Sequence, residues 1–101
     1  MPSASSNPPP EFGEVVWRGD CCIETVAERH EELVRALETE LPVRIDAREV
    51  SRLDTAGLQL LVSFSLELAR RGRELSWAGA SEAVMQAVAL AGVTRVLGLP
   101  R

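Results

Sequence analysis

Segments of the chain differ in the spacing of their apolar residues, and this spacing predicts the secondary structure. Residues 43–47 alternate between apolar and charged side chains, as in a strand with one buried face. Residues 24–39 instead have apolar side chains at helical spacing. Such patterns predict strands over residues 14–17, 21–23, 43–47, 74–78 and 94–99, and helices over residues 24–39, 54–71 and 82–91.

The predicted order of elements is β-β-α-β-α-β-α-β. Strands separated by helices need crossover connections, so the predicted fold class is an α/β sandwich. Its sheet would be mixed and mostly parallel, with about four to five strands covered by about three helices. Capping residues agree with the helix boundaries: Asp54 opens the second helix, Ser81 precedes the third, and Gly72 and Gly92 follow these two helices.

The first residues differ in composition from the rest of the chain. Residues 1–11 are mostly Pro, Ser and other small or polar residues, which predicts a disordered tail, and residues 12–101 are predicted to form one domain. The chain opens without a secretory leader, and its apolar stretches are far shorter than the roughly 20 residues that cross a bilayer. We therefore expect a cytoplasmic protein that is not embedded in a membrane.

Charge and composition exclude several kinds of chemistry. The formal net charge is −4, with 15 acidic and 11 basic residues, which argues against a nucleic-acid partner. The two cysteines are adjacent, at Cys21 and Cys22, and His30 is the only histidine, so we expect no metal site. The sequence offers no set of nucleophile, base and orienting residue and no glycine-rich nucleotide loop. We therefore expect neither catalytic residues nor a cofactor.

The second predicted helix has apolar residues on two sides. At about 100° per residue, one side of the helix is expected to face the sheet, and it has Leu58, Leu61, Val62, Ser65, Leu66 and Ala69. Leu60 and Phe64 fall almost opposite, where a helix covering a sheet normally exposes polar residues. We therefore predict that Leu60 and Phe64 form an exposed apolar patch that binds a partner. The alternative is that a neighbouring helix of the same chain covers them.

Thr55 is predicted to lie in the first turn of this helix. Free backbone N–H groups and the positive end of the helix dipole favour a phosphate there. Phosphorylation would add a charge of about −1.5 to −2 beside Asp54. That charge is costly to bury in an interface that also contains Leu60 and Phe64, so Thr55 is a candidate switch for binding. The alternative is that Asp54 and Thr55 only cap the helix. The switch requires Thr55 to be exposed and the two apolar side chains to be left uncovered by the chain itself.

The residues around Thr55 resemble the signature of a known family. The predicted strand over residues 43–47 is followed by Val50 and then by the run Leu53-Asp54-Thr55-Ala56-Gly57-Leu58-Gln59-Leu60-Leu61. This order resembles the STAS domain, the family of bacterial anti-sigma-factor antagonists and their relatives. In that family an apolar strand leads into Asp-Ser/Thr-x-Gly and then an apolar helix. The resemblance extends over residues 14–99, nearly all of the predicted domain.

The resemblance implies a non-enzymatic regulatory module that binds a protein partner. In antagonists of this family, a partner kinase phosphorylates the hydroxyl residue after the Asp and thereby blocks binding, a role that maps onto Thr55. The implied partner is an anti-sigma factor or a histidine-kinase-type ATPase. The remaining motif and partner-binding positions are Asp54, Ala56, Gly57, Leu60 and Phe64.

An alternative function follows from other STAS proteins that have Thr at this position. They include a cytoplasmic accessory subunit that binds the ATPase of phospholipid-transport ABC systems, in which the Thr is a contact residue. The chain departs from the family in two ways, since Ser is usual where it has Thr55, and members commonly end in a further helix whereas this sequence stops at Arg101. We expect the missing helix to leave sheet surface that permits a homodimer.

Overall fold

The structure, a computed structural model, describes residues 12–99, and the tail predicted for residues 1–11 lies outside this range. Its elements in chain order are β1 (Gly13–Cys21), the 3-10 turn η2 (Ile23–Thr25), α1 (Val26–Leu37), β2 (Val43–Leu53), α2 (Thr55–Arg70), β3 (Leu75–Ala80), α3 (Glu82–Ala91) and α4 (Thr94–Leu97). The side chains of Asp54 and Ser81 cap α2 and α3 as predicted. Gly92 ends α3 in the left-handed conformation, which glycine adopts without strain.

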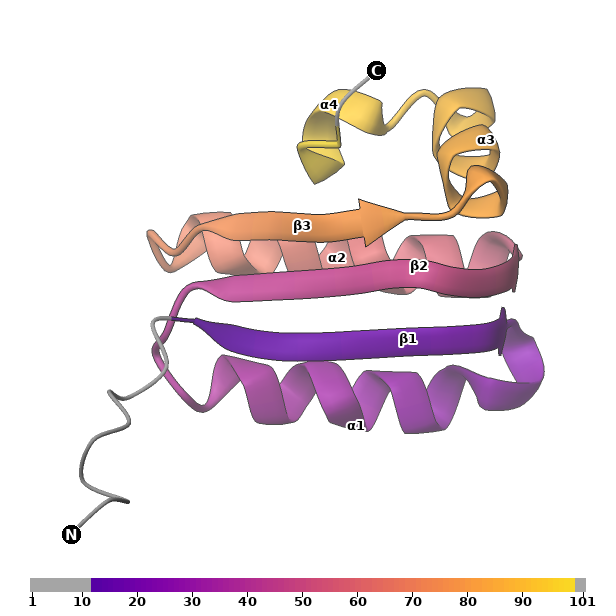
Figure 1. Ribbon diagram of the computed structural model, residues 1–101. Coiled ribbons are helices and arrows are strands. Elements are labelled where there is room, and N and C mark those ends of the chain that lie inside the picture. The colour runs from indigo at the N-terminus through magenta and orange to yellow at the C-terminus, as the bar shows by residue number, and fades with distance from the viewer. Residues whose placement is uncertain (1–11, 100–101) are drawn as a thin grey trace, which may run out of the picture.

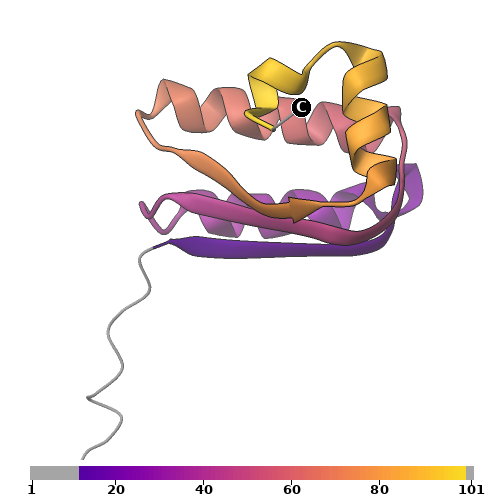
Figure 2. The ribbon, with the colours of Figure 1, turned by 45° about the horizontal axis from the view of Figure 1, so that its top comes forward.

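The strands form one parallel sheet in the order β1-β2-β3 (Figure 1). The α1 helix connects β1 to β2, and α2 connects β2 to β3. Figure 2 shows that α1, α2 and α4 lie on the same side of the sheet, and that α3 lies where β3 ends. The α/β fold class predicted from the sequence is therefore confirmed.

The number of strands is lower than predicted. The sequence predicts four to five strands in a mixed sheet, whereas residues 12–99 contain three, all parallel. The strand predicted over residues 21–23 does not form, because the chain turns into η2 directly after β1. The Thr25 hydroxyl stabilises this turn by donating to the carbonyl oxygens of Asp20 and Cys22, which is a local alternative to strand pairing.

The strand predicted over residues 94–99 is also wrong, because this segment begins with the short helix α4. The carbonyl oxygens of Val96 and Leu97 accept hydrogen bonds from the Ser65 hydroxyl of α2 and the Trp77 indole of β3. Short apolar segments fit a strand and a helical turn equally well, and here these tertiary contacts favour the turn. The homodimer expected from sheet surface that a missing final helix would leave stays a prediction.

Side chains of β1 alternate between a covered and an open face of the sheet. Val15 and Trp17 are buried in the core under the helices. Glu14, Val16 and Arg18 are exposed on the opposite face. Parallel sheets usually have both faces covered by helices. In residues 12–99, the second face of this sheet is open and displays charged side chains.

Candidate functional site

Asp54 joins the start of α2 to the turn after β1. Its Oδ1 accepts a hydrogen bond from the Gly57 N–H at 3.0 Å, and its Oδ2 accepts one from the Ile23 N–H of η2 at 3.0 Å. These hydrogen bonds, with the one from Gly57 as the largest cause, lower the pKa of the Asp54 carboxyl from its ordinary value. Asp54 is therefore ionised at neutral pH and fixes the first turn of α2. The contact with Ile23 has no counterpart in the sequence prediction.

We expect Asp54→Asn to destabilise the fold at neutral pH and to have little effect at low pH. The asparagine side chain keeps one acceptor oxygen but places an NH₂ donor opposite one of the two backbone N–H groups. Because the pKa of Asp54 is lowered in the folded state, its contribution is present above the unfolded pKa, near 3.8, and is lost as the pH falls through the folded pKa. Thermal unfolding of both proteins from neutral pH to about pH 2 measures this effect. A Tm difference that persists undiminished in acid would contradict the assigned role.

Gly57 lies where α2 passes closest to the end of β1. A Cβ atom built on this residue would lie 2.3 Å from the carbonyl oxygen of Cys21 and 2.8 Å from Cδ1 of Leu53. The close approach therefore requires a residue without a side chain. Packing explains the glycine of the motif: it lets the start of α2 lie against the ends of β1 and β2.

Thr55 is the first residue of α2 and is exposed, as predicted. Ala56 is half-buried beside it. Asp54 and Gly57 thus hold the helix start in place, and Thr55 presents its side chain to solvent at the positive end of α2.

The prediction that Leu60 and Phe64 form an exposed patch is wrong. Phe64 is only 4% exposed, and Leu60 is half-buried against the core. Both side chains line the narrow groove between α1 and α2, together with Leu33 and Leu37 of α1. The alternative interpretation of the sequence therefore holds for Phe64, because a neighbouring helix of the same chain covers it. The condition that these two side chains stay open for a partner is not met.

The exposed apolar side of α2 lies elsewhere on the helix. Relative to the predicted orientation, α2 is turned by roughly a quarter turn about its axis, at 100° per residue. Leu61 is buried as predicted, but Leu58 and Val62 are only half-buried, and Leu66 is 57% exposed. Leu58, Val62 and Leu66 recur every four residues and form one continuous line, which we call the outer stripe of α2.

The outer stripe begins next to Thr55. A groove of about 510 Å³ runs over this part of the surface. It is lined by Thr55, Leu58, Gln59, Val62 and Ser63 of α2, by Ala91, the last residue of α3, and by Val93 just after α3. Thr55 and apolar side chains thus share one open surface, although not the side chains that the sequence predicts.

Three further features of residues 12–99 concern metal binding, thiol chemistry and membrane spanning. No group of three or more His, Cys, Asp or Glu side chains in this range could hold a metal ion. Cys21 and Cys22 are free and buried, and burial raises the pKa of the Cys21 thiol, which disfavours the reactive thiolate. In the same range, no helix combines the length and apolar content that a membrane span needs.

The sequence matches the family model described as "Mlab, STAS domain" over residues 10–99. The chain belongs to the STAS domain family. Among solved structures, this STAS domain is similar to the STAS domain of a SulP transporter from Vibrio cholerae, with 22% sequence identity and a TM-score of 0.67. The match covers 92% of this chain and 73% of that one, and at this identity it shows a shared fold. No curated protein matches the chain.

Proposed function

We propose that this STAS domain is a non-enzymatic regulatory module that docks a protein partner over Thr55 and the outer stripe of α2. The observation that supports this function most is the exposed Thr55 side chain at the rim of an apolar groove. A STAS domain is a protein-interaction module, and in this groove the apolar side chains of Leu58 and Val62 lie on one surface with Thr55 of the motif. The half-buried Leu58 and Val62 and the exposed Leu66 supply apolar area for a partner to cover.

A phosphate on Thr55 would oppose docking at this surface. A partner kinase would transfer the terminal phosphoryl group of ATP to the Thr55 hydroxyl oxygen, which loses its proton, and would release ADP. The positive end of α2 tolerates the added charge of about −1.5 to −2 in the free protein. A partner that covers the groove would have to bury that charge beside the ionised Asp54, at a high desolvation cost. Phosphorylation is therefore expected to weaken the complex and leave the fold intact.

The proposed partner is a protein with an ATPase-type domain, such as an anti-sigma factor or a histidine-kinase-type ATPase. The net charge of −4 gives no support to a nucleic-acid partner. A cytoplasmic location agrees with such a partner and stays a prediction.

Thr55 variants test the switch. We expect Thr55→Glu to weaken binding to the ATPase-type partner by about tenfold or more, because it puts a charge into the groove. Thr55→Val keeps the shape of the threonine side chain and, unlike Thr55→Glu, adds no charge. It is therefore expected to bind as the parent chain does. Titration calorimetry measures both affinities. Equal affinities for Thr55→Glu and the parent chain would refute the proposed docking site.

A second candidate function is a constitutive accessory subunit that binds the ATPase of a phospholipid-transport ABC system. It is favoured by the extent of exposed apolar surface beyond Thr55, which includes Leu66 and the 90% exposed Leu90. A permanent partner would cover such surface in the cell. The two functions differ when ATP is added to the complex. The switch predicts that the parent chain gains one phosphate at Thr55 and dissociates while Thr55→Val stays bound, and the subunit function predicts no change in either complex.

A further inference from the structure

The outer edge of β1 is free. In the described part of the chain, residues 12–99, β2 is the only strand that pairs with β1. The Gly13 N–H points toward β2 and donates to the carbonyl oxygen of Pro42, the residue that precedes β2. The carbonyl oxygen of Arg18 points away from β2 and accepts a hydrogen bond from the Arg29 side chain of α1. Backbone groups alternate in direction along a strand. Glu14, Val16 and Arg18 therefore present their backbone N–H and C=O groups at the free edge.

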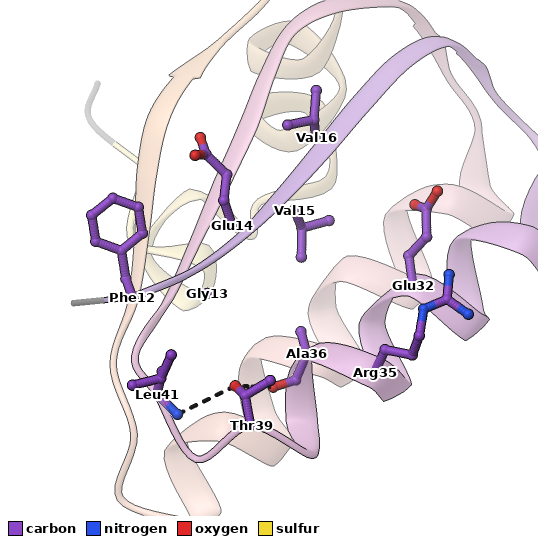
Figure 3. Close-up of a pocket in the computed structure, with 10 residues that line it drawn as sticks. All are labelled: Phe12, Gly13, Glu14, Val15, Val16, Glu32, Arg35, Ala36, Thr39 and Leu41. Carbon is purple, nitrogen blue, oxygen red and sulfur yellow. Dashed lines mark hydrogen bonds between the residues drawn. The ribbon is translucent and has the colours of Figure 1, made fainter. Parts of the chain in front are cut away.

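A groove runs along this edge between β1 and α1 (Figure 3). Its volume is about 780 Å³, and it is lined by residues 12–16 and by Glu32, Arg35 and Ala36 of α1. Figure 3 shows Val15 pointing toward α1, while Glu14 and Val16 point to the other side of the strand. The groove thus leaves room beside β1 for another extended segment.

The exposed side chains along this edge are complementary in charge to the same side chains of a second copy. Glu14 lies two residues before Val16, and Arg18 lies two residues after it. All three side chains are exposed on the open face. Neither charge forms an ion pair within residues 12–99. In an antiparallel pair of β1 strands with a two-fold axis at Val16, Glu14 of each copy faces Arg18 of the other. The Val16 side chains, each 38% exposed, meet at the axis.

Backbone geometry favours the same alignment. Val16 presents its backbone groups at the free edge, so two copies of Val16 can exchange both N–H···O bonds. The Arg18 N–H can also donate to the Glu14 carbonyl oxygen of the other copy, whereas the Arg18 carbonyl oxygen keeps its hydrogen bond from Arg29. A two-fold axis at Glu14 or at Arg18 would instead place identical charges opposite each other. Gly19, with a φ of 68°, interrupts the regular strand and ends the paired segment.

We infer that the chain self-associates as a two-fold dimer through antiparallel pairing of β1 about Val16, which joins the sheets of both copies into one. The occupant of the β1 groove is therefore a second copy of this chain. The interface uses none of the residues around Thr55 or the outer stripe of α2. Each dimer presents two docking surfaces, which would raise the avidity for a partner that itself has two binding sites.

Charge reversal in the full chain tests this arrangement. Glu14→Arg places arginines opposite each other at both ends of the interface, and Arg18→Glu places glutamates there. We expect either variant alone to raise the dimer Kd by about tenfold or more. An equimolar mixture of the two variants restores opposite charges in every facing pair, so it is expected to dimerise as the parent does. Both positions are exposed, and circular dichroism checks that each variant is folded.

Sedimentation equilibrium over a concentration series measures the Kd of the parent, of each single variant and of the mixture. A dimeric parent, weakened single variants and a mixture that recovers the dimer would support the inference. It would be overturned by a parent that stays monomeric up to about 1 mM, the weak end of specific binding. It would equally be overturned by single variants that dimerise like the parent, or by a mixture that stays monomeric.

Discussion

Phe64→Ala is expected to lower the free energy of unfolding by about 3–5 kcal/mol. Phe64 is 4% exposed and belongs to the core cluster, where it packs between α1 and α2. Removing its ring leaves a cavity that the two helices can close only in part, because each is also anchored to the sheet. Urea unfolding of the parent and the variant measures the difference. If Phe64 were the exposed contact residue that the helical pattern predicts, the loss would be near zero.

Leu66→Ala is the matched control for this experiment. Leu66 lies two residues further along α2 and is 57% exposed. Alanine is at least as good a helix former as leucine, so the variant is expected to change the free energy of unfolding by less than about 0.5 kcal/mol. A loss at Leu66 as large as that at Phe64 would mean that α2 is not oriented as described.

Gly57→Ala is expected to destabilise the fold by about 2 kcal/mol or more, although alanine is the better helix former. Alanine gains about 1 kcal/mol in helix propensity, whereas overpacking costs about 1–3 kcal/mol and occasionally more. Here the cost falls at the upper end, because the new Cβ would lie 2.3 Å from the backbone oxygen of Cys21. Backbone at the end of a paired strand cannot move aside as a flexible side chain can.

Ala56→Gly is the matched control for Gly57→Ala. It makes the reverse substitution at the preceding residue of the same helical turn and is expected to cost at most about 1 kcal/mol through propensity. Thermal and urea unfolding of the two variants give the comparison. A Gly57→Ala protein that is more stable than the parent would show that α2 does not approach Cys21 as closely as described.

The sequence predicts the boundaries of α2 and α3 well because local chemistry sets them. Asp54 and Ser81 cap the two helices through their own side chains, and Gly92 takes the left-handed conformation after α3. Such signals act over three or four residues and need no tertiary contact. For the same reason the motif residue Thr55 is correctly placed at an exposed helix start.

The side of α2 that is buried depends on contacts that the sequence pattern does not contain. Two sides of α2 are equally apolar, so a helical projection fits two orientations of the helix. One side has Leu60 and Phe64, and the other has Leu58, Val62 and Leu66. The packing of α1 beside α2 decides between them. One local signal was present in the sequence: a helical glycine often marks a close approach, and Gly57 lies on the buried side with Leu61 and Phe64.

The strand count depends on tertiary contacts in the same way. The segment after α3 is short and apolar, and its pattern does not separate a strand from a helical turn. Hydrogen bonds from Ser65 and Trp77, which are distant in the sequence, go to the carbonyl oxygens of α4. These contacts become apparent only once α2 and β3 are in place.

The affinity of Leu66→Asp for the ATPase-type partner tests the central claim, that the partner docks over Thr55 and the outer stripe of α2. Leu66 is exposed, so the variant is expected to keep the Tm of the parent. A charge in the stripe is expected to weaken binding by about tenfold or more. Val34→Asp, on the exposed side of α1, introduces the same charge away from Thr55 and is expected to bind like the parent. Unchanged affinity for Leu66→Asp, together with weakened binding of Val34→Asp, would contradict the account.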